Sequence, residues 1–138
     1  MKCNKNSPKH SGLTLIEVLI TLVILGIVSG IAYPTYTQQI RESHRMIALG
    51  DMLALQMELE RSYNAGYQFN QVVSGGVCQI CESEPGRYQF EVVSSATAAY
   101  TITAVAQSAS GQSKDSCLDQ DKTMTLNSTG ETTPIACW

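Results

Sequence analysis

The sequence predicts an α+β protein in which one long N-terminal helix packs against an antiparallel sheet. Two observations carry this prediction. Apolar residues follow a helical pattern from Leu13 to about Asn64, and an alternation of apolar and polar residues replaces that pattern after residue 86. The chain has 138 residues, of which 43% are hydrophobic and 15% charged, and this suits one modest domain rather than two.

The apolar run from Leu13 to Ala32 is long enough to cross a membrane. A helix over this run, at about 1.5 Å per residue, extends about 30 Å, the thickness of a bilayer's hydrocarbon core. Three lysines and no acidic residue precede Gly12. Basic residues stay on the cytoplasmic side, so we expect the N-terminus inside the cell and the later chain outside.

Glu17 is the one ionisable residue in this run. An unpaired carboxylate in a membrane costs about 2.5 kcal/mol or more, so a helix that keeps one usually has a use for it. A secretory signal cut near residues 30–32 fits poorly. The apolar region of such signals is typically about 7 to 15 residues long, whereas the run in this chain is longer and contains Glu17. A simple uncleaved anchor leaves Glu17 without a purpose, and a contact with lipid headgroups is a further alternative.

Helical periodicity resumes directly after Pro34, a residue that lacks a backbone N–H and ordinarily kinks or ends a helix. We therefore expect one helix, kinked near Pro34, with Ala65-Gly66 as its stop signal. His44 lies in a polar stretch of this helix and is expected to be solvated. The second half is amphipathic, and its apolar stripe should pack on the sheet. That stripe consists of Met46, Leu49, Met52, Leu53, Leu59 and Tyr63.

Three segments alternate as strands do: Arg87–Val93, Tyr100–Ala106 and Thr123–Asn127. A short fourth strand is possible at the C-terminal end, which gives an antiparallel meander, and residues 68–86 are expected to form a loop. The alternation places one set of side chains toward the helix. This set is Tyr88, Phe90, Val92, Tyr100, Ile102, Ala104, Met124 and Leu126.

Five cysteines are present, and Cys3 lies in the basic leader. The other four suit two disulfides in an oxidising compartment, with Cys78–Cys81 as a tight ring and Cys117–Cys137 closing the C-terminal segment. Four cysteines allow three connectivities, so crossed pairings stay open. A thioredoxin-type redox pair at Cys78 and Cys81 would require a βαβ pattern, which the sequence does not show. A zinc site formed by all four cysteines is disfavoured, because Cys117 and Cys137 are twenty residues apart.

The remaining candidate sites are weak. Asp115, Asp119 and Asp121 could ligate calcium, but their spacing is not that of an EF-hand, and a solvated acidic loop is the simpler interpretation. Asn127-Ser128-Thr129 is expected to form a turn. No nucleophile with a base, phosphate loop or distinctive carboxylate pair is found, so the sequence predicts neither an enzyme nor a cofactor.

The stretch Gly12-Leu13-Thr14-Leu15-Ile16-Glu17 resembles the class III leader motif of type IV prepilins, with Leu13 where the family usually has Phe. Gly26 and Pro34 also fall where many such pilins have a glycine and a proline. The resemblance implies that a prepilin peptidase cleaves after Gly12 and methylates the new N-terminus of Leu13. It also implies that Glu17 pairs with the N-terminal amine of a neighbouring subunit and so fixes the register of packed helices.

The C-terminal Cys137-Trp138 is similar to the end of many PilE-like minor pilins. The resemblance implies a type IV pilin fold with a disulfide-closed C-terminal loop. It implies a cleaved leader over residues 1–12, a transmembrane and assembly half of the helix over residues 13–33, and a periplasmic or extracellular head over residues 34–138.

The function that this resemblance implies is a structural subunit of a type IV pilus, a minor pilin that serves adhesion, twitching motility or DNA uptake. It would sit in a bacterial inner membrane and later in the extracellular fibre. Its partners would be other pilin subunits, the prepilin peptidase and the inner-membrane assembly machinery. A fibre-borne binding module for DNA or a surface is one alternative. Removal of residues 1–12 takes the formal net charge from −3 to −6, which argues weakly against a general grip on nucleic acid. A type II secretion pseudopilin is the other alternative.

Overall fold

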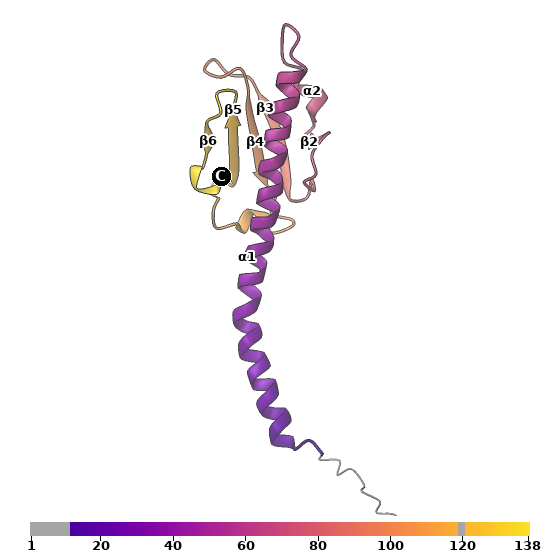
Figure 1. The fold of residues 1–138 in the computed structure, drawn as a ribbon, viewed down its shortest axis with the longest axis vertical. Helices are drawn as coiled ribbons and strands as arrows, with labels where there is room; N and C mark the ends of the chain where they lie inside the picture. Colours follow the sequence, from indigo (N-terminus) through magenta and orange to yellow (C-terminus); the bar gives the residue numbers. More distant parts are fainter. Residues whose placement is uncertain (1–11, 119–120) are drawn as a thin grey trace, which may run out of the picture. The chain divides into compact units, whose positions relative to one another are not determined.

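A computed structural model describes residues 12–118 and 121–138 of the chain. It begins with the helix α1 (Leu15–Arg61), which takes up 47 residues (Figure 1). The chain divides into two units, with the boundary between Tyr36 and Thr37. The first unit holds the apolar half of α1, and the second holds the other half and everything after it.

The first unit is helical from Leu15 onward, because leucine is a good helix former and no proline occurs in α1 before Pro34. By length and composition, α1 could cross a membrane through this apolar half. Its large side chains are all solvent-exposed in the single chain, for example 64% for Leu22 and 61% for Leu25. Pro34 lies inside α1, and helix continues on both sides of it. The kink that we expect there stays a prediction.

The second unit contains a four-stranded antiparallel sheet in the order β3-β4-β5-β6. Strand β3 (Tyr88–Val93) pairs with β4 (Thr101–Ala106), and β4 pairs with β5 (Thr123–Asn127). The short β6 (Thr132–Thr133) adds to the free edge of β5. The chain order along the sheet is that of a simple meander, so the predicted α+β fold and its three main strands are confirmed.

The connection between α1 and the sheet has more structure than the predicted loop. It contains the short helix α2 (Phe69–Val72) and a hairpin of β1 (Val73–Ser74) and β2 (Val77–Cys78). Gly75 and Gly76 form the turn of this hairpin with φ angles of 59° and 79°, a backbone region that glycine enters without steric cost. Two 3₁₀ turns follow later in the chain, η1 (Gln112–Lys114) and η2 (Ile135–Cys137).

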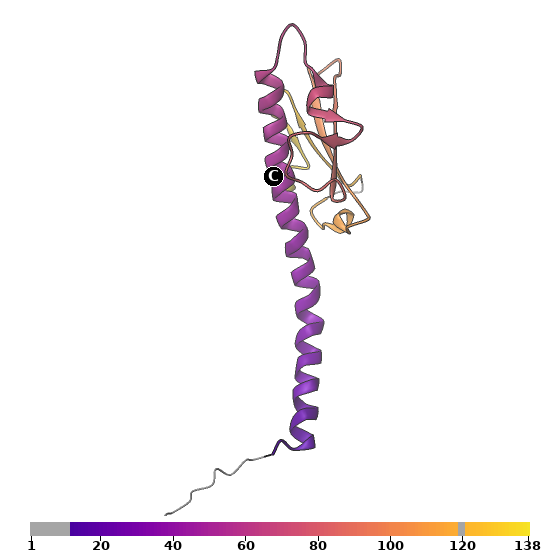
Figure 2. The same cartoon turned by 90° about the vertical axis from the view of Figure 1, so that its right-hand side faces the viewer.

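The core of the second unit lies between α1 and one face of the sheet (Figure 2). The helix contributes Ala48, Met52, Leu55 and Leu59, each with no exposed surface. The predicted inward set of strand residues supplies the other side, and all of it is buried except Val92, which is half-buried. Alternation in the strands therefore identified the inner face of the sheet correctly.

The predicted stripe of α1 is wrong at three of its six positions. Met46, Leu53 and Tyr63 are 60%, 47% and 55% exposed, whereas Ala48 and Leu55, which the predicted stripe omits, are buried. The helix also ends at Arg61, three residues before Asn64. The physical reason for the wrong stripe is that apolar residues occupy two faces of this half of α1, so periodicity alone does not identify the face that packs on the sheet.

Candidate functional site

The N-terminal stretch lies in the first unit, at the start of α1. Gly12, Leu13 and Thr14 precede the helix, and Leu13 is 74% exposed. The Thr14 hydroxyl accepts a hydrogen bond from the backbone N–H of Glu17 at 3.3 Å, as an N-cap does. The Glu17 side chain is exposed, and no cation pairs with it among the described residues. A carboxylate with no cation beside it among the described residues could pair with a cation of another chain.

A second site lies in the head, where the β4–β5 loop (residues 107–122) contacts α1. Arg45 donates through Nη1 to both carboxylate oxygens of Asp115, at 2.7 Å each. Both residues are buried, with exposed fractions of 8% and 1%. Removal of either partner would leave a buried charge alone, so this ion pair holds the loop firmly against the helix.

Two further side chains of α1 extend this contact along the helix. The Gln38 amide donates to Asp115 and to the Ser116 hydroxyl, the latter at 2.9 Å. Arg41 donates through Nε to the Gly111 carbonyl at 3.1 Å. Positions 38, 41 and 45 share one side of a helix, so three successive turns of α1 bind one loop.

Gln112 closes the contact from the loop side. Its amide donates to the Arg41 carbonyl at 2.8 Å and to the Tyr88 hydroxyl at 3.1 Å. Gln112 has no exposed surface, and burial raises the pKa of Tyr88 to about 12. The β4–β5 loop is thereby joined to both α1 and β3.

Disulfides Cys117–Cys137 and Cys78–Cys81 are both present. The first closes the C-terminal segment directly after Asp115, whose carboxylate also accepts the Cys117 N–H at 3.1 Å, and this confirms the predicted disulfide-closed C-terminal loop. The segment after Cys81 is held separately. Asp51 of α1 accepts the backbone N–H groups of Glu82 and Ser83, at 2.9 Å each.

The acidic cluster does not have the character that the sequence suggested. Asp115 is buried against Arg45 rather than solvated, so its carboxylate is already neutralised. Asp121 is exposed, and Asp119 lies outside the described residues. No group of three or more metal-binding side chains occurs in the described part of the chain. These contacts give calcium no support at Asp115.

The distribution of cations in the head points to the same loop. From Thr37 onward the sequence has six basic residues against eleven acidic ones. Arg61 and Arg87 pair on the surface with Glu58 and Glu84, at 3.1 Å and 3.5 Å. Arg45 is buried with Asp115. The remaining three belong to the β4–β5 loop or contact it, and they are Arg41, Lys114 and Lys122.

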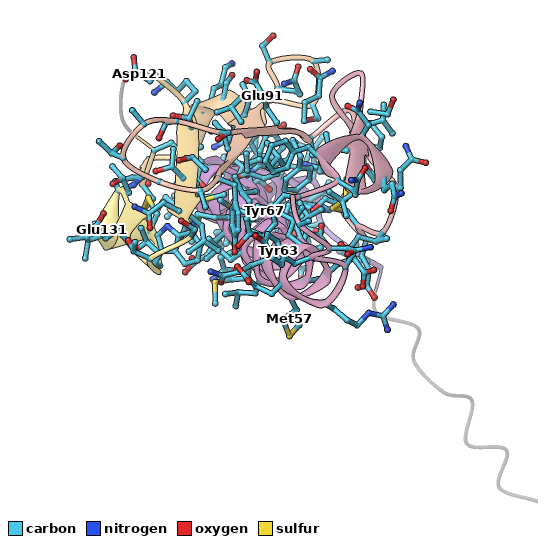
Figure 3. The ribbon with its side chains drawn as sticks, turned by 90° about the horizontal axis from the view of Figure 1, so that it is seen from above. Met57, Tyr63, Tyr67, Glu91, Asp121 and Glu131 are labelled. Carbon is cyan, nitrogen blue, oxygen red and sulfur yellow. A yellow bond between two sulfur atoms is a disulfide. The ribbon has the colours of Figure 1, made fainter. Side chains whose placement is uncertain are left out.

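An aromatic cluster fixes the opposite end of α1, where Figure 3 shows Tyr63 and Tyr67 close together. The ring centroids of Tyr67 and Tyr100 are 4.9 Å apart in an edge-to-face arrangement. Both hydroxyls donate to Glu60, that of Tyr100 at 2.6 Å. Burial and the Glu60 carboxylate raise the pKa of Tyr100 above its usual range. These contacts attach the end of the helix to β4, which suits a structural role.

Sequence reasoning missed the most strongly held feature of the head, the Arg45–Asp115 pair. The two residues are 70 positions apart and neither lies in a recognisable motif. His44 also differs from the prediction, because it is half-buried rather than solvated, and its pKa is lowered by burial and by the Arg87 guanidinium. The cleavage, methylation and pairing roles of Gly12, Leu13 and Glu17 stay predictions.

Comparisons with known proteins identify two families along the chain. A model described as the prokaryotic N-terminal methylation motif matches residues 7–33. A model described as the type IV minor pilin ComP, DNA uptake sequence receptor, matches residues 34–121, more than half of the chain and nearly the whole of the head up to the β4–β5 loop. Neither curated proteins nor solved structures give a match. The chain therefore belongs to the ComP family of type IV minor pilins.

Proposed function

We propose that this minor pilin serves DNA uptake: a prepilin peptidase cleaves it after Gly12, α1 incorporates it into a pilus, and its head binds DNA. The single observation that supports the DNA step most is the place of the three cations of the head that have no carboxylate partner among the described residues. All three lie on or against the β4–β5 loop, inside the segment that matches the ComP family or, for Lys122, directly after it. No comparable observation on this chain favours a role in adhesion or in secretion.

The head is acidic as a whole, so DNA binding has to be local. Lys114 is exposed, and Lys122 is half-buried, with Nζ 3.5 Å from the Leu118 carbonyl. Phosphate contacts of this kind release counterions, so affinity should fall as salt rises, with a shallow slope because few cations take part. Asp121 lies beside Lys122 and repels phosphate. Any sequence preference would therefore depend on contacts with base edges.

The DNA step is tested with the purified chain in detergent, by a gel shift across a salt series. The double variant Lys114→Gln/Lys122→Gln should weaken binding at low salt and lower the salt slope by about 2, since each phosphate contact contributes about 1. Arg61→Gln is the matched control, because this exposed cation lies at the far end of the second half of α1. Equal losses in the two variants, or none in either, would contradict the assignment to the β4–β5 loop.

The assembly step depends on Glu17. In a filament, an α-amine on Leu13 would be surrounded by apolar helices, and pairing with Glu17 of a neighbouring subunit would neutralise two charges at one axial register. Glu17→Ala should leave membrane insertion intact and strongly reduce the amount of this pilin in sheared pili. Thr21→Ala is the control, since it removes another exposed polar group from the same half of α1. Normal incorporation of Glu17→Ala would rule out the pairing role.

Processing is tested by the intact mass of the mature protein together with N-terminal sequencing. The expected product lacks Met1–Gly12 and carries a methyl group on Leu13. It also has four fewer hydrogens than the reduced chain, because of the two disulfides. A mature chain that begins near residue 31 would instead indicate an ordinary signal peptide.

A further inference from the structure

The turn after α1 begins a long run of residues without charge. No acidic, basic or histidine residue occurs from Ser62 to Cys81, although 15% of the chain is charged. The first part of this run is rich in aromatic rings and side-chain amides. Rigid rings supply contact area and amides supply adaptable hydrogen bonds, a combination typical of surfaces that recognise ligands. The rings are those of Tyr63, Tyr67 and Phe69, and the amides are those of Asn64, Gln68, Asn70 and Gln71.

The turn brings two of these rings together at the end of the head. Ala65 adopts a φ angle of 58°, in the left-handed region that residues with a Cβ atom rarely enter. The Asn64 N–H donates to the Gly66 carbonyl at 3.4 Å across this turn. The ring centroids of Tyr63 and Tyr67 are 4.9 Å apart, with an angle of 57° between the ring planes. Figure 3, which views the molecule from above, shows these two side chains close together.

Attachment of the helix end to β4 accounts for Tyr67 and Tyr100 but not for Tyr63. Tyr100 has no exposed surface, and the hydroxyls of Tyr67 and Tyr100 both donate to Glu60. Tyr63 is 55% exposed, and its hydroxyl has no hydrogen-bond partner in the part of the chain that the structure describes. A large ring that stays half in water keeps an apolar surface available for a ligand.

Glu60 places a polar group beside the rings. Its carboxylate accepts the Tyr100 hydroxyl at 2.6 Å and the Tyr67 hydroxyl at 3.2 Å, so these bonds fix its position before a ligand arrives. Glu60 is exposed, and a carboxylate can accept about four hydrogen bonds, so it has capacity left for hydroxyl groups of a ligand. The same charge repels phosphate and other anions. Arg61 follows Glu60 in the chain but pairs with Glu58 at 3.1 Å.

We propose that this end of the head binds an uncharged polysaccharide, with one hexose ring against Tyr63 and its hydroxyl groups hydrogen-bonded to Glu60. A pyranose ring has a face of C–H groups that packs on an aromatic ring, and a rim of hydroxyl groups that bond to carboxylates and amides. A neutral sugar requires no cation, which agrees with the absence of charge in the run after α1. The site, which we call the tip platform, consists of Glu60, Tyr63, Tyr67 and the exposed amides of Asn64 and Gln68.

The tip platform and the proposed DNA contacts lie at opposite ends of β4. Tyr100, which is bonded to Glu60, directly precedes this strand, and the β4–β5 loop with its two lysines follows it. Six residues of strand extend about 20 Å. Single-stranded DNA also stacks on aromatic rings, but such sites combine the rings with a positively charged groove. The one charge in the tip platform is negative, so the observations favour a neutral sugar, and this inference does not depend on the proposed DNA step.

The deciding experiment is saturation-transfer NMR on the full-length chain, in a detergent that has no sugar headgroup. The probes are cellohexaose and mannohexaose, two neutral hexose oligomers, at millimolar concentration. Irradiation of the aromatic protons should transfer saturation to C–H protons of at least one oligomer, and a titration gives its dissociation constant. Tyr63→Leu keeps apolar volume but loses the flat ring, so it should weaken binding about tenfold. Tyr63→Phe keeps the ring and should bind as the wild type does.

Met57→Ala is the matched control, because it removes another exposed apolar side chain from the same half of α1. It should leave sugar binding unchanged. The melting temperature of Tyr63→Leu should stay near that of the wild type. If it falls, the double variant Asn64→Ala/Gln68→Ala decides instead, since both amides are exposed and Gln68 makes no side-chain cap to α2. Wild-type affinity in the deciding variant, or no binding of either oligomer by the wild type, would overturn the proposal.

A gel shift with duplex DNA and with oligothymidylate separates this inference from the proposed DNA binding. Tyr63→Leu should bind DNA as the wild type does, and Lys114→Gln/Lys122→Gln should bind the sugar oligomers as the wild type does. If the wild type bound a sugar but no DNA, the DNA step would fail and the tip platform would stand. If Tyr63→Leu lost DNA binding and the wild type bound no sugar, the rings would belong to a nucleic-acid site and the proposal would be wrong.

Discussion

The two halves of α1 are one continuous helix, yet they have opposite relations to the rest of the chain. In the first half no residue is buried, and the charge at Glu17 has no partner among the described residues. In the second half seven residues are buried, including the charged Arg45, which pairs with Asp115, and Asp51, which accepts two backbone N–H groups. The difference teaches that the buried face of the second half stabilises the head, whereas the first half contributes no buried residue among those described. Changes in the first half should affect pili without affecting folding, and changes on the buried face should affect folding first.

The same truncation in both halves of α1 tests most directly whether they contribute differently to the stability of the head. Leu55→Ala removes a side chain with no exposed surface and should lower the free energy of unfolding by about 3 to 5 kcal/mol, the transfer and cavity terms together. Leu22→Ala, whose side chain is 64% exposed, should leave thermal unfolding of the head unchanged. Near-UV circular dichroism of the chain in detergent measures both. Equal destabilisation by the two variants would show that the halves are not energetically separate.

The ion pair between α1 and the β4–β5 loop tests the second half alone. Asp115→Ala leaves the buried Arg45 guanidinium without its main partner, and we expect a loss of about 3 kcal/mol or more in chemical denaturation. Glu42 is only 3.7 Å from Arg45, but it is exposed and cannot replace a buried carboxylate fully.

The double variant Arg45→Met/Asp115→Leu is the control for this pair. It removes both charges and keeps apolar volume, so most of the lost stability should return. If the double variant is as unstable as Asp115→Ala, the pair is not the reason for the loss. In that case the hydrogen bonds from Gln38 and to the Cys117 N–H would be the main contribution of Asp115.

The sheet and the second half of α1 differ in how well the sequence predicted their buried faces. Alternation in β3, β4 and β5 predicted the inner face of the sheet, since a strand that is half-buried has a period of two. The predicted buried stripe of α1 was partly wrong. It included Met46 and Leu53, which lie with Met57 on a second, exposed apolar face of the helix. A sequence pattern shows that a face is apolar, but not whether the same chain or another molecule covers it.

The contacts between α1 and the β4–β5 loop could not be predicted at all. Arg45 and Asp115 lie 70 residues apart, and each has the character of an ordinary surface charge in its own segment. The packing of the sheet on α1 brings the loop to the helix, and the Cys117–Cys137 disulfide joins the loop to the C-terminal segment. By contrast, the leader motif at Gly12–Glu17 is a continuous run of residues, so the sequence alone carries the family resemblance there.

The two disulfides extend the comparison to the head itself, because they close loops of very different length. Cys117 and Cys137 are separated by 20 residues, and Cys78 and Cys81 by three. On the chain-entropy model, replacement of the first pair by serine should cost about 3 kcal/mol, and replacement of the second about half as much. Thermal unfolding of the two double-serine variants measures this. A larger loss for the Cys78–Cys81 variant would show that the ring after β2 has a further role in holding the segment bound by Asp51.

The smallest expected effect concerns His44, the histidine at the start of the buried part of α1. Burial and the Arg87 guanidinium lower its pKa in the folded head, partly offset by Glu84. The unfolded chain therefore binds a proton more readily than the folded one, so stability is complete above pH of about 6.5 and declines as the pH falls below that value. His44→Gln should remove this part of the decline, and the difference in melting temperature between variant and wild type should change between pH 7.5 and pH 5. Arg87→Gln should reduce the same difference without abolishing it, since burial, the larger cause, remains. A difference that is constant over this range would mean that folding of the head does not change the proton affinity of His44.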